Sequence, residues 1–188
     1  MTVSIIGRAL AAGTPLLLAT LGEIYCQRAG IMNLGIEGMM AVGAVSAFWA
    51  SSLTGNPWLG LAAAAGAGVA LSLLHAVSTV LFRSNQIVSG LALTMLGLGL
   101  SGVFGKSLVG KPLAHRFLPL PLPFLSDLPF IGPSLFSQDP VFYLAVLLWI
   151  FLCVHFLYTR HGLRLRAVGD HPLAAETMCV PVIRYKML

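Results

Sequence analysis

The sequence predicts an all-α fold, a polytopic transmembrane helical bundle with about five spans. Of its 188 residues, 57% are hydrophobic and 9% are charged, whereas a soluble domain averages about 25% charged residues. The few charges leave uncharged runs at 38–82, 84–105 and 140–159. Because a spanning helix needs about 20 mostly apolar residues, these runs hold at least four spans, and residues 3–22 add another. This composition excludes soluble enzymes and disordered tails.

The net charge and the cysteines bear on three further properties: nucleic-acid binding, disulfide bonds and metal sites. The net charge of +5 does not indicate a nucleic-acid partner, because the basic residues lie in loops between the expected spans, where membrane topology accounts for them. The three cysteines, Cys26, Cys153 and Cys179, are far apart in the chain. Their number and spacing give neither a disulfide framework nor a metal site.

Turn signals place the five expected helices at residues 3–22, 39–53, 58–82, 87–104 and 141–158. The first helix contains Arg8 and Pro15 and loosely resembles a signal peptide. No small-x-small cleavage site follows it, so we expect the helix to be retained. Pro57 suits the first position of the third helix, and the polar turn 83–86 separates the third helix from the fourth.

Two loops differ in character from the spans. Seven of the eleven prolines lie in residues 106–140, and this density excludes a continuous helix, so we expect an external, irregular or polyproline-like loop. Residues 160–186 carry five of the eleven basic residues and are expected on the cytoplasmic side. Counting spans backwards places the N-terminus outside, unless a segment enters the membrane without crossing it. We treat 1–188 as one transmembrane domain, incomplete because 180–188 reads as a loop leading into a further span.

A glycine-punctuated segment at 30–38 separates the first two helices. Its polar residues Asn33 and Glu37 stand beside Gly35 and Gly38. Transporters use broken elements of this kind to expose backbone groups and helix ends to a solute. The alternative is an ordinary cytoplasmic turn in which the Glu37 carboxylate stabilises the positive end of the second helix. Spacing alone leaves both interpretations open.

A second polar segment lies at 162–176, between the last expected span and the C-terminus. Pro172 suits the first turn of a short helix that would stop before Pro181. This helix could dock into a groove on a soluble partner, or lie on anionic lipid, held there by its arginines. The candidate residues of this segment are Arg164, Arg166, Gly169, Asp170, Pro172, Ala174, Ala175 and Glu176.

Both polar segments resemble a known family. Residues 22–40, GEIYCQRAGIMNLGIEGMM, closely resemble the signature of integral-membrane permeases of ABC importers, in the branched-chain amino-acid/ribose family and its simple-sugar/nucleoside branch. Residues 162–176, GLRLRAVGDHPLAAE, resemble the cytoplasmic loop of that branch, whose short coupling helix contacts the ATP-binding subunit. Residues 125–140, LSDLPFIGPSLFSQDP, are similar to its external loop. The resemblance covers nearly the whole chain, and family members continue with several more spans.

Two positions depart from the pattern of that branch. Asp170 and His171 stand where the branch commonly has Glu-Asn, which keeps an acidic residue before Pro172. Cys179 stands where the branch commonly has glycine. Cysteine tolerates a left-handed backbone poorly, so this substitution leaves the end of the short helix open.

The resemblance implies a permease subunit of an ABC importer, without enzymatic activity, that translocates a small polar solute, most plausibly a nucleoside or a simple sugar. It implies three protein partners: an ATP-binding subunit, a second permease subunit and an extracellular or periplasmic solute-binding protein. The chain has no G-x-x-x-x-G-K-[ST] loop, so ATP would be bound by the partner, and we expect no cofactor and no metal on this chain. The expected location is the lipid bilayer of a bacterial plasma (inner) membrane. The residues 30–38 become candidates for the solute pathway.

Three alternatives stay open beside this interpretation. An ion-gradient-driven secondary transporter would favour ionisable residues inside the spans, of which only His75, His155 and Glu37 qualify. A permease for branched-chain amino acids fits the wider family. An intramembrane hydrolase would need a nucleophile and a base, such as His75 with Ser72 or Ser78. We expect His75 and His155 to be neutral and hydrogen-bonded across helices.

The fourth expected helix carries several small residues. Ser89, Thr94 and Ser101 lie there with four glycines, Gly90, Gly97, Gly99 and Gly102. We expect this set to allow close helix packing rather than to bind solute.

Overall fold

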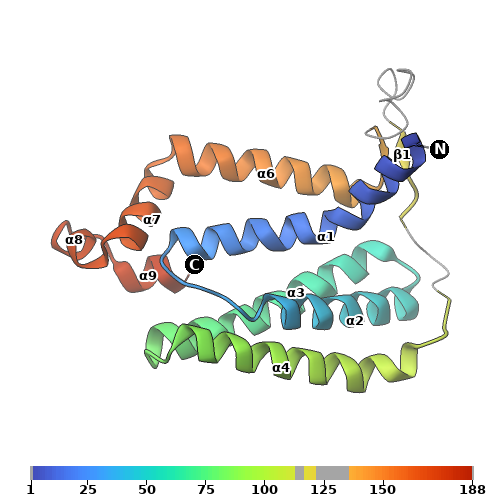
Figure 1. Ribbon diagram of the computed structural model, residues 1–188, viewed down its shortest axis with the longest axis horizontal. Helices are drawn as coiled ribbons and strands as arrows, with labels where there is room; N and C mark the ends of the chain where they lie inside the picture. Colours follow the sequence, from blue (N-terminus) through green and yellow to red (C-terminus); the bar gives the residue numbers. More distant parts are fainter. Residues whose placement is uncertain (1, 113–116, 122–135, 188) are drawn as a thin grey trace. The chain divides into compact units, whose positions relative to one another are not determined.

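The computed structural model describes residues 2–112, 117–121 and 136–187. Five long helices in this part of the chain are apolar enough to cross a membrane, which confirms the all-α polytopic class (Figure 1). They are α1 (Thr2–Arg28), α2 (Ile36–Thr54), α3 (Pro57–Ala76) with its π-helical continuation η1 (Val77–Leu81), α4 (Gln86–Gly105) with the short η2 (Lys106–Leu108), and α6 (Pro140–Tyr158).

Helix α1 runs past the expected end at Gly22. It continues through Glu23 to Arg28, and Gln27 Nε2 donates to Glu23 Oε1 one turn away at 3.0 Å. Polar residues end the apolar run there, but an i,i+4 side-chain pair of this kind supports a helix. The sequence therefore located the end of the apolar run correctly and the end of the helix too early.

The second helix was expected from residue 39, but α2 begins at Ile36, so residues 36–38 of the glycine-punctuated segment are helical. The expected starts of α3 and α4 lie within a residue of the observed ones, because the chain carries capping residues there. Asn56 Oδ1 accepts from Trp58 N at 2.9 Å at the start of α3, with Pro57 in the first turn. Asn85 Oδ1 accepts from Ile87 N at 3.0 Å at the start of α4. Both are side-chain N-caps.

The proline-rich region contains a short antiparallel ladder between β1 (Leu120–Pro121) and β2 (Ser137–Gln138). Tyr143 Oη donates to Leu120 O at 3.2 Å and accepts from Gln138 N at 3.3 Å. One tyrosine thus bonds both strands. In its described residues, the expected irregular loop therefore contains a short two-stranded ladder. Residues 113–116 and 122–135 lie outside the described residues.

Three short helices follow α6. They are α7 (Arg160–Asp170), α8 (Pro172–Thr177) and α9 (Val182–Met187). The sequence predicted α8 from Pro172 but expected only a basic stretch where α7 stands. Helix α7 is amphipathic, because Gly162, Leu165 and Val168 recur every three residues and are buried.

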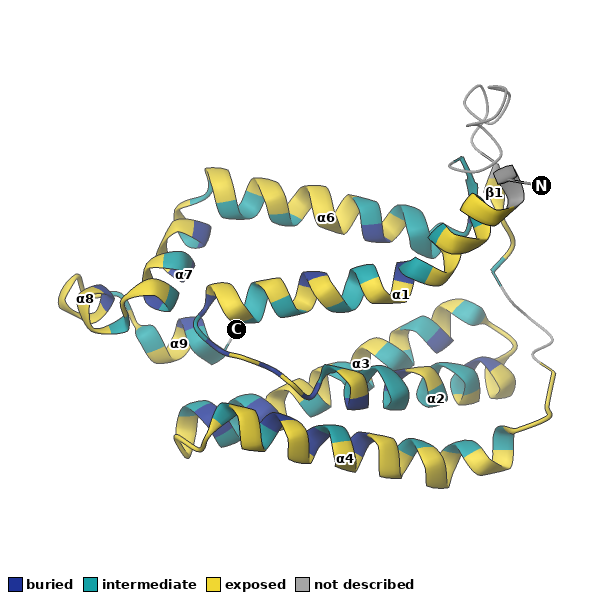
Figure 2. Ribbon diagram, in the orientation of Figure 1, coloured by how far each residue is buried: buried dark blue, intermediate teal, exposed yellow. Residues whose placement is uncertain are grey.

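The chain divides into two compact units, 1–22 with 117–159, and 23–116 with 160–188. In the second unit α2 packs against both α3 and α4. Glycines make these approaches possible: a Cβ on Gly60 would lie 2.7 Å from Ala47 O. Much of the helical surface is exposed and apolar (Figure 2), as in Met95 of α4 and Leu157 of α6, which suits contact with lipid rather than water.

Candidate functional site

The segment 29–35 between α1 and α2 is not helical, and neighbouring side chains bond its backbone. Gln86 Oε1 accepts from Met32 N at 2.8 Å. His75 Nε2 lies 3.2 Å from Met32 O, and Thr94 Oγ1 donates to Leu34 O at 2.7 Å. Non-helical backbone at membrane depth persists only where such partners or a watery cavity satisfy it.

The His75 ring is almost fully buried, at 4% exposed. A carbonyl oxygen can only accept, so Nε2, which faces Met32 O, carries the proton. Ser89 Oγ lies 3.4 Å from Nδ1 and 3.2 Å from Ser78 Oγ. His75 therefore bonds across helices as expected, and its contacts hold the Met32 backbone.

Asn33 is buried, and its side chain is used inside the segment. Asn33 Oδ1 accepts from Gly35 N at 2.9 Å, closing a turn on its own backbone. Asn33 N donates to Glu23 Oε1 at 3.3 Å. The other carboxylate oxygen, Glu23 Oε2, is buried and has no hydrogen-bond partner among the described residues.

Glu37 lies in the first turn of α2, and Gly35 occupies the N-cap position. Its carboxylate is exposed and stands at the positive end of the helix dipole. This geometry fits the interpretation in which the Glu37 carboxylate stabilises the N-terminal end of α2. It also leaves the carboxylate accessible to a solute, so the geometry is compatible with both interpretations.

Gly35 and Gly38 serve close packing. A Cβ on Gly38 would lie 2.7 Å from Leu93 O and 2.8 Å from Thr94 Cα. A Cβ on Gly35 would meet the Leu93 side chain at 2.6 Å. The start of α2 therefore lies directly on the backbone of α4.

The four glycines inside α4 that precede its last residue, Gly105, divide into two pairs. Gly90 and Gly97 face Leu34 and Gly38 closely enough to exclude a side chain, whereas Gly99 and Gly102 have nothing within 4 Å. The packing role expected for all four holds for the first pair and is not seen for the second.

Helix α8 begins at Pro172, as the sequence predicted, and buries Ala175. Leu173 and Met178 point away from the protein, at 80% and 79% exposed. Ala174 and Glu176 are exposed too. The element thus presents two large apolar side chains and a carboxylate.

Helix α8 ends in a turn that is formed by Cys179. Its backbone is left-handed, with φ of +58°. Cys179 N donates to Glu176 O at 2.9 Å, and Val180 N donates to Ala175 O at 3.1 Å. These bonds terminate the helix in the way that a C-terminal glycine usually does, so the cysteine adopts the glycine-like conformation and α8 ends at Thr177, well before Pro181.

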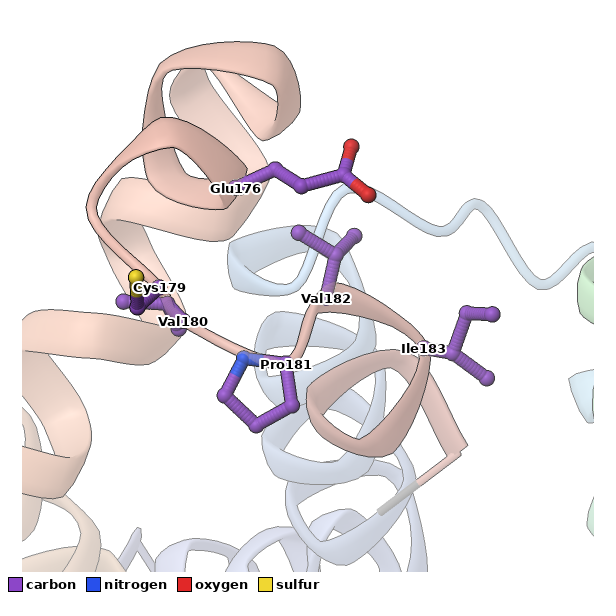
Figure 3. A pocket seen from close by; sticks show the side chains of 6 residues that line it. All are labelled: Glu176, Cys179, Val180, Pro181, Val182 and Ile183. Atoms are coloured by element: carbon purple, nitrogen blue, oxygen red, sulfur yellow. The ribbon is translucent and has the colours of Figure 1, made fainter.

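A cavity of about 360 Å³ lies between α8 and α9 (Figure 3). The Glu176 side chain extends over it from α8 toward Val182. The remaining lining residues are Cys179, Val180, Pro181 and Ile183. The cavity is therefore apolar, with one carboxylate beside it.

The structure brings the two polar segments of the sequence together. A Cβ on Gly169, at the end of α7, would collide with the carbonyl oxygen of Arg28 and lie 3.1 Å from Gly30 N. Gly30 has φ of +78°, and a Cβ there would lie 3.1 Å from Gly169 Cα. The two glycines meet backbone to backbone.

The remaining predicted residues of this segment lie on the surface or partly so. Arg164 and Asp170 are exposed, and Arg166 is half-buried. Within the described ranges, no group of three or more His, Cys, Asp or Glu could hold a metal ion.

Sequence reasoning missed Glu23, Gln86 and the contact of Thr94 with the glycine-rich segment. Gln86 looked like part of a polar turn, and Thr94 looked like a small packing residue. The available signal was weak: polar side chains at helix ends, in a chain where few polar residues occur.

Comparison with known proteins assigns the family. Residues 5–188 match the family described as "Branched-chain amino acid transport system / permease component". A putative glucose ABC transporter permease protein of Haloferax volcanii is 41% identical, over 94% of this chain and 55% of its own. A guanosine ABC transporter permease protein of Bacillus subtilis is 37% identical, over 97% and 60%.

A nucleoside ABC transporter permease protein of Lactococcus lactis subsp. cremoris is 35% identical, over 97% of this chain and 61% of its own. The chain thus spans a little more than half the length of these relatives. No solved structure matches it significantly. With a family match over almost every residue and these identities, the chain belongs to the branched-chain amino acid transport system permease family, whose members here are sugar and nucleoside ABC permeases.

Proposed function

We propose that this chain is the membrane-spanning part of an ABC importer for a nucleoside or a simple sugar. The relatives named for glucose, guanosine and nucleoside transport support this solute class over branched-chain amino acids. ATP is bound by a separate subunit, and this chain performs no enzymatic step. A second permease subunit and an external solute-binding protein complete the importer, in the plasma membrane of a bacterium.

The observation that carries the proposal is the surface of α8. Leu173 and Met178 are the large apolar side chains most exposed around this short helix, and α8 is too short to span a membrane. Exposed apolar side chains on such an element mark a docking surface. The adjoining cavity, with Glu176 beside it (Figure 3), gives a partner both an apolar recess and a charge to bind. The partner that an ABC permease needs at this position is its ATP-binding subunit.

Side chains and backbone contacts support the predicted orientation. Gly30 contacts Gly169, and α9 packs against η1 at the end of α3. The glycine-rich segment, the turn after η1 and the basic loop therefore share one side of the membrane. The arginines of the loop support a cytoplasmic location for that side by the positive-inside rule.

The solute pathway is proposed at the glycine-rich segment. Glu37 is exposed at the start of α2, and Glu23 Oε2 is a buried acceptor without a partner among the described residues. Hydroxyl groups of a sugar or ribose are donors that suit such acceptors. Asn33, by contrast, maintains the shape of the segment, and Gly35 and Gly38 set its distance from α4.

The test replaces residues 170–176 by a Gly-Ser sequence in the full-length permease. We expect the ATP-binding subunit to be lost on purification and solute uptake to stop, with membrane insertion unchanged. A matched control replaces the external-side turn 54–56, which lies outside α8. Retained uptake in the 170–176 variant, or uptake in vesicles driven by an ion gradient without ATP, would refute the proposal and favour a secondary transporter.

A further inference from the structure

We propose that the contact between Gly30 and Gly169 is the joint through which movement of α8 reaches the glycine-rich segment. This inference rests on the proposed function, in which α8 is moved by an ATP-binding subunit. It goes further by naming two positioning residues and the route between them.

The first step is the stiffness of the α7–α8 element. His171, the single residue between the helices, donates from its N–H to Ala167 O at 3.0 Å, and its carbonyl accepts from Ala175 N at 3.0 Å. Leu165 and Val168 are fully buried on the inner face of α7. Helices joined by one doubly bonded residue move together, so a displacement of α8 displaces Gly169.

The second step is the contact itself. The Gly169 backbone lies against the Arg28 carbonyl and Gly30, so a Cβ on Gly169 would collide with the Arg28 carbonyl oxygen and a Cβ on Gly30 would lie only 3.1 Å from Gly169 Cα. Flexible side chains could absorb a displacement by changing rotamer, whereas directly packed backbone cannot. A displacement of Gly169 is therefore passed to Gly30.

The third step is the fixed position of the segment that follows Gly30. Ile31 N donates to Cys26 O at 3.0 Å, and the Ile31 side chain is buried. Beyond it Met32 is bonded to Gln86 and to His75. Movement of Gly30 thus acts directly on the backbone that Gln86 and His75 hold, and shifts this backbone against those two side chains.

Helix α9 provides a second attachment. It contacts η1 and α3, and the ring centroids of His161 in α7 and Tyr185 in α9 lie 4.8 Å apart. The π-helical η1, in turn, follows directly after His75, which bonds the glycine-rich segment. A π-helix is a frequent feature of functional sites. The region α7–α9 therefore contacts the glycine-rich segment directly at Gly30 and also contacts η1, which begins two residues after the His75 that bonds this segment.

The experiment uses the full-length permease, assembled with its ATP-binding subunit and binding protein and reconstituted in vesicles. Gly169→Ala is compared with Gly66→Ala, whose added Cβ would have nothing within 4 Å. Solute uptake and ATP hydrolysis are measured on the assembled complexes of both variants. In Gly169→Ala, solute uptake per ATP hydrolysed falls by roughly 5- to 150-fold, the usual range of coupling between sites.

A second variant keeps the test decisive if Gly169→Ala fails to assemble. Gly30→Asn retains a residue that tolerates positive φ but adds a side chain against Gly169. Its matched control is Gly110→Asn, where φ is +81° and nothing lies within 4 Å. The inference predicts uncoupling in Gly30→Asn and wild-type behaviour in Gly110→Asn.

The outcomes separate the two proposals. The assembled Gly169→Ala or Gly30→Asn complexes could transport as many solute molecules per ATP as their controls. That result would contradict the proposed coupling through Gly30 and Gly169 and leave the proposed function intact. A wild-type permease that never associates with an ATP-binding subunit would overturn both.

Discussion

The glycine-rich segment 29–35 and the proline-rich region 106–140 are both irregular by sequence, but they are held in different ways. In the first, side chains from three helices bond the backbone, namely Glu23, His75 and Thr94 with Gln86. In the described part of the second, Tyr143 bonds β1 and β2. The first stretch is thus fixed at several points by side chains from three helices, and the described part of the second by a tyrosine of α6. In both, polar side chains of helices position the irregular backbone.

The largest expected effect comes from the packing at Gly38. Gly38→Ala places a Cβ against the α4 backbone at Leu93 and Thr94, neither of which can move as a flexible side chain can. We expect destabilisation of about 3 kcal/mol, the upper end for overpacking. Thermal unfolding in detergent measures it. Gly43→Ala on the same helix is the control, because its Cβ meets Ala64 at an ordinary 3.9 Å; equal melting temperatures would contradict the packing role.

Much of the fold could be predicted from the sequence because helices depend on local patterns. Charge-free runs gave four of the five spans, and the apolar run 3–22 gave the fifth. Pro57, the polar turn 83–86 and Pro172 marked three helix starts within a residue. The end of α1 was predicted too early, because Glu23 to Arg28 are polar yet helical.

The site could be predicted only in part. The two candidate segments were identified from their residues, and the cross-helix bonding of His75 is confirmed. Their partners were not predicted, because Gln86 bonds a residue 54 positions away and Thr94 one 60 positions away. Periodicity and spacing report neighbours in the chain, so the meeting of Gly30 with Gly169 could not be read from them.

A smaller effect is expected from the bond that holds the glycine-rich segment on α3. His75→Ala removes a buried side chain and leaves the Met32 carbonyl without its hydrogen-bond partner, and we expect a loss of about 2 kcal/mol. Ser72→Ala on the same helix removes only a bond to its own turn and serves as control. If the two variants unfolded at the same temperature, the segment would not depend on His75.

A third irregular segment, 178–181, extends the comparison, because backbone bonds hold it rather than side chains. Cys179→Gly relieves a left-handed backbone that costs a non-glycine residue about 1–2 kcal/mol, offset in part by the greater entropy of glycine when unfolded. We expect a net gain of about 0.5–1 kcal/mol in thermal unfolding. Arg83→Gly, at the other non-glycine residue with positive φ in the described chain, should behave alike; a loss of stability in both would contradict the strain argument.

The smallest effect belongs to the proline-rich region. Tyr143→Phe removes the hydroxyl that bonds β1 and β2, with an expected loss of about 0.5–1 kcal/mol confined to the ladder. Hydrogen exchange should become faster at the Gln138 amide and stay unchanged at Met32. Faster exchange at both positions would show that the two irregular segments are not held independently.

The central claim is that α8 faces the cytoplasm and is bound there by an ATP-binding subunit, and the exposed thiol of Cys179 tests it directly. With Cys26 and Cys153 replaced by serine, a membrane-impermeant maleimide is applied to intact cells and to inside-out vesicles. The account predicts labelling of Cys179 in inside-out vesicles alone, and protection when the ATP-binding subunit is added back. Labelling of Cys179 in intact cells would contradict it.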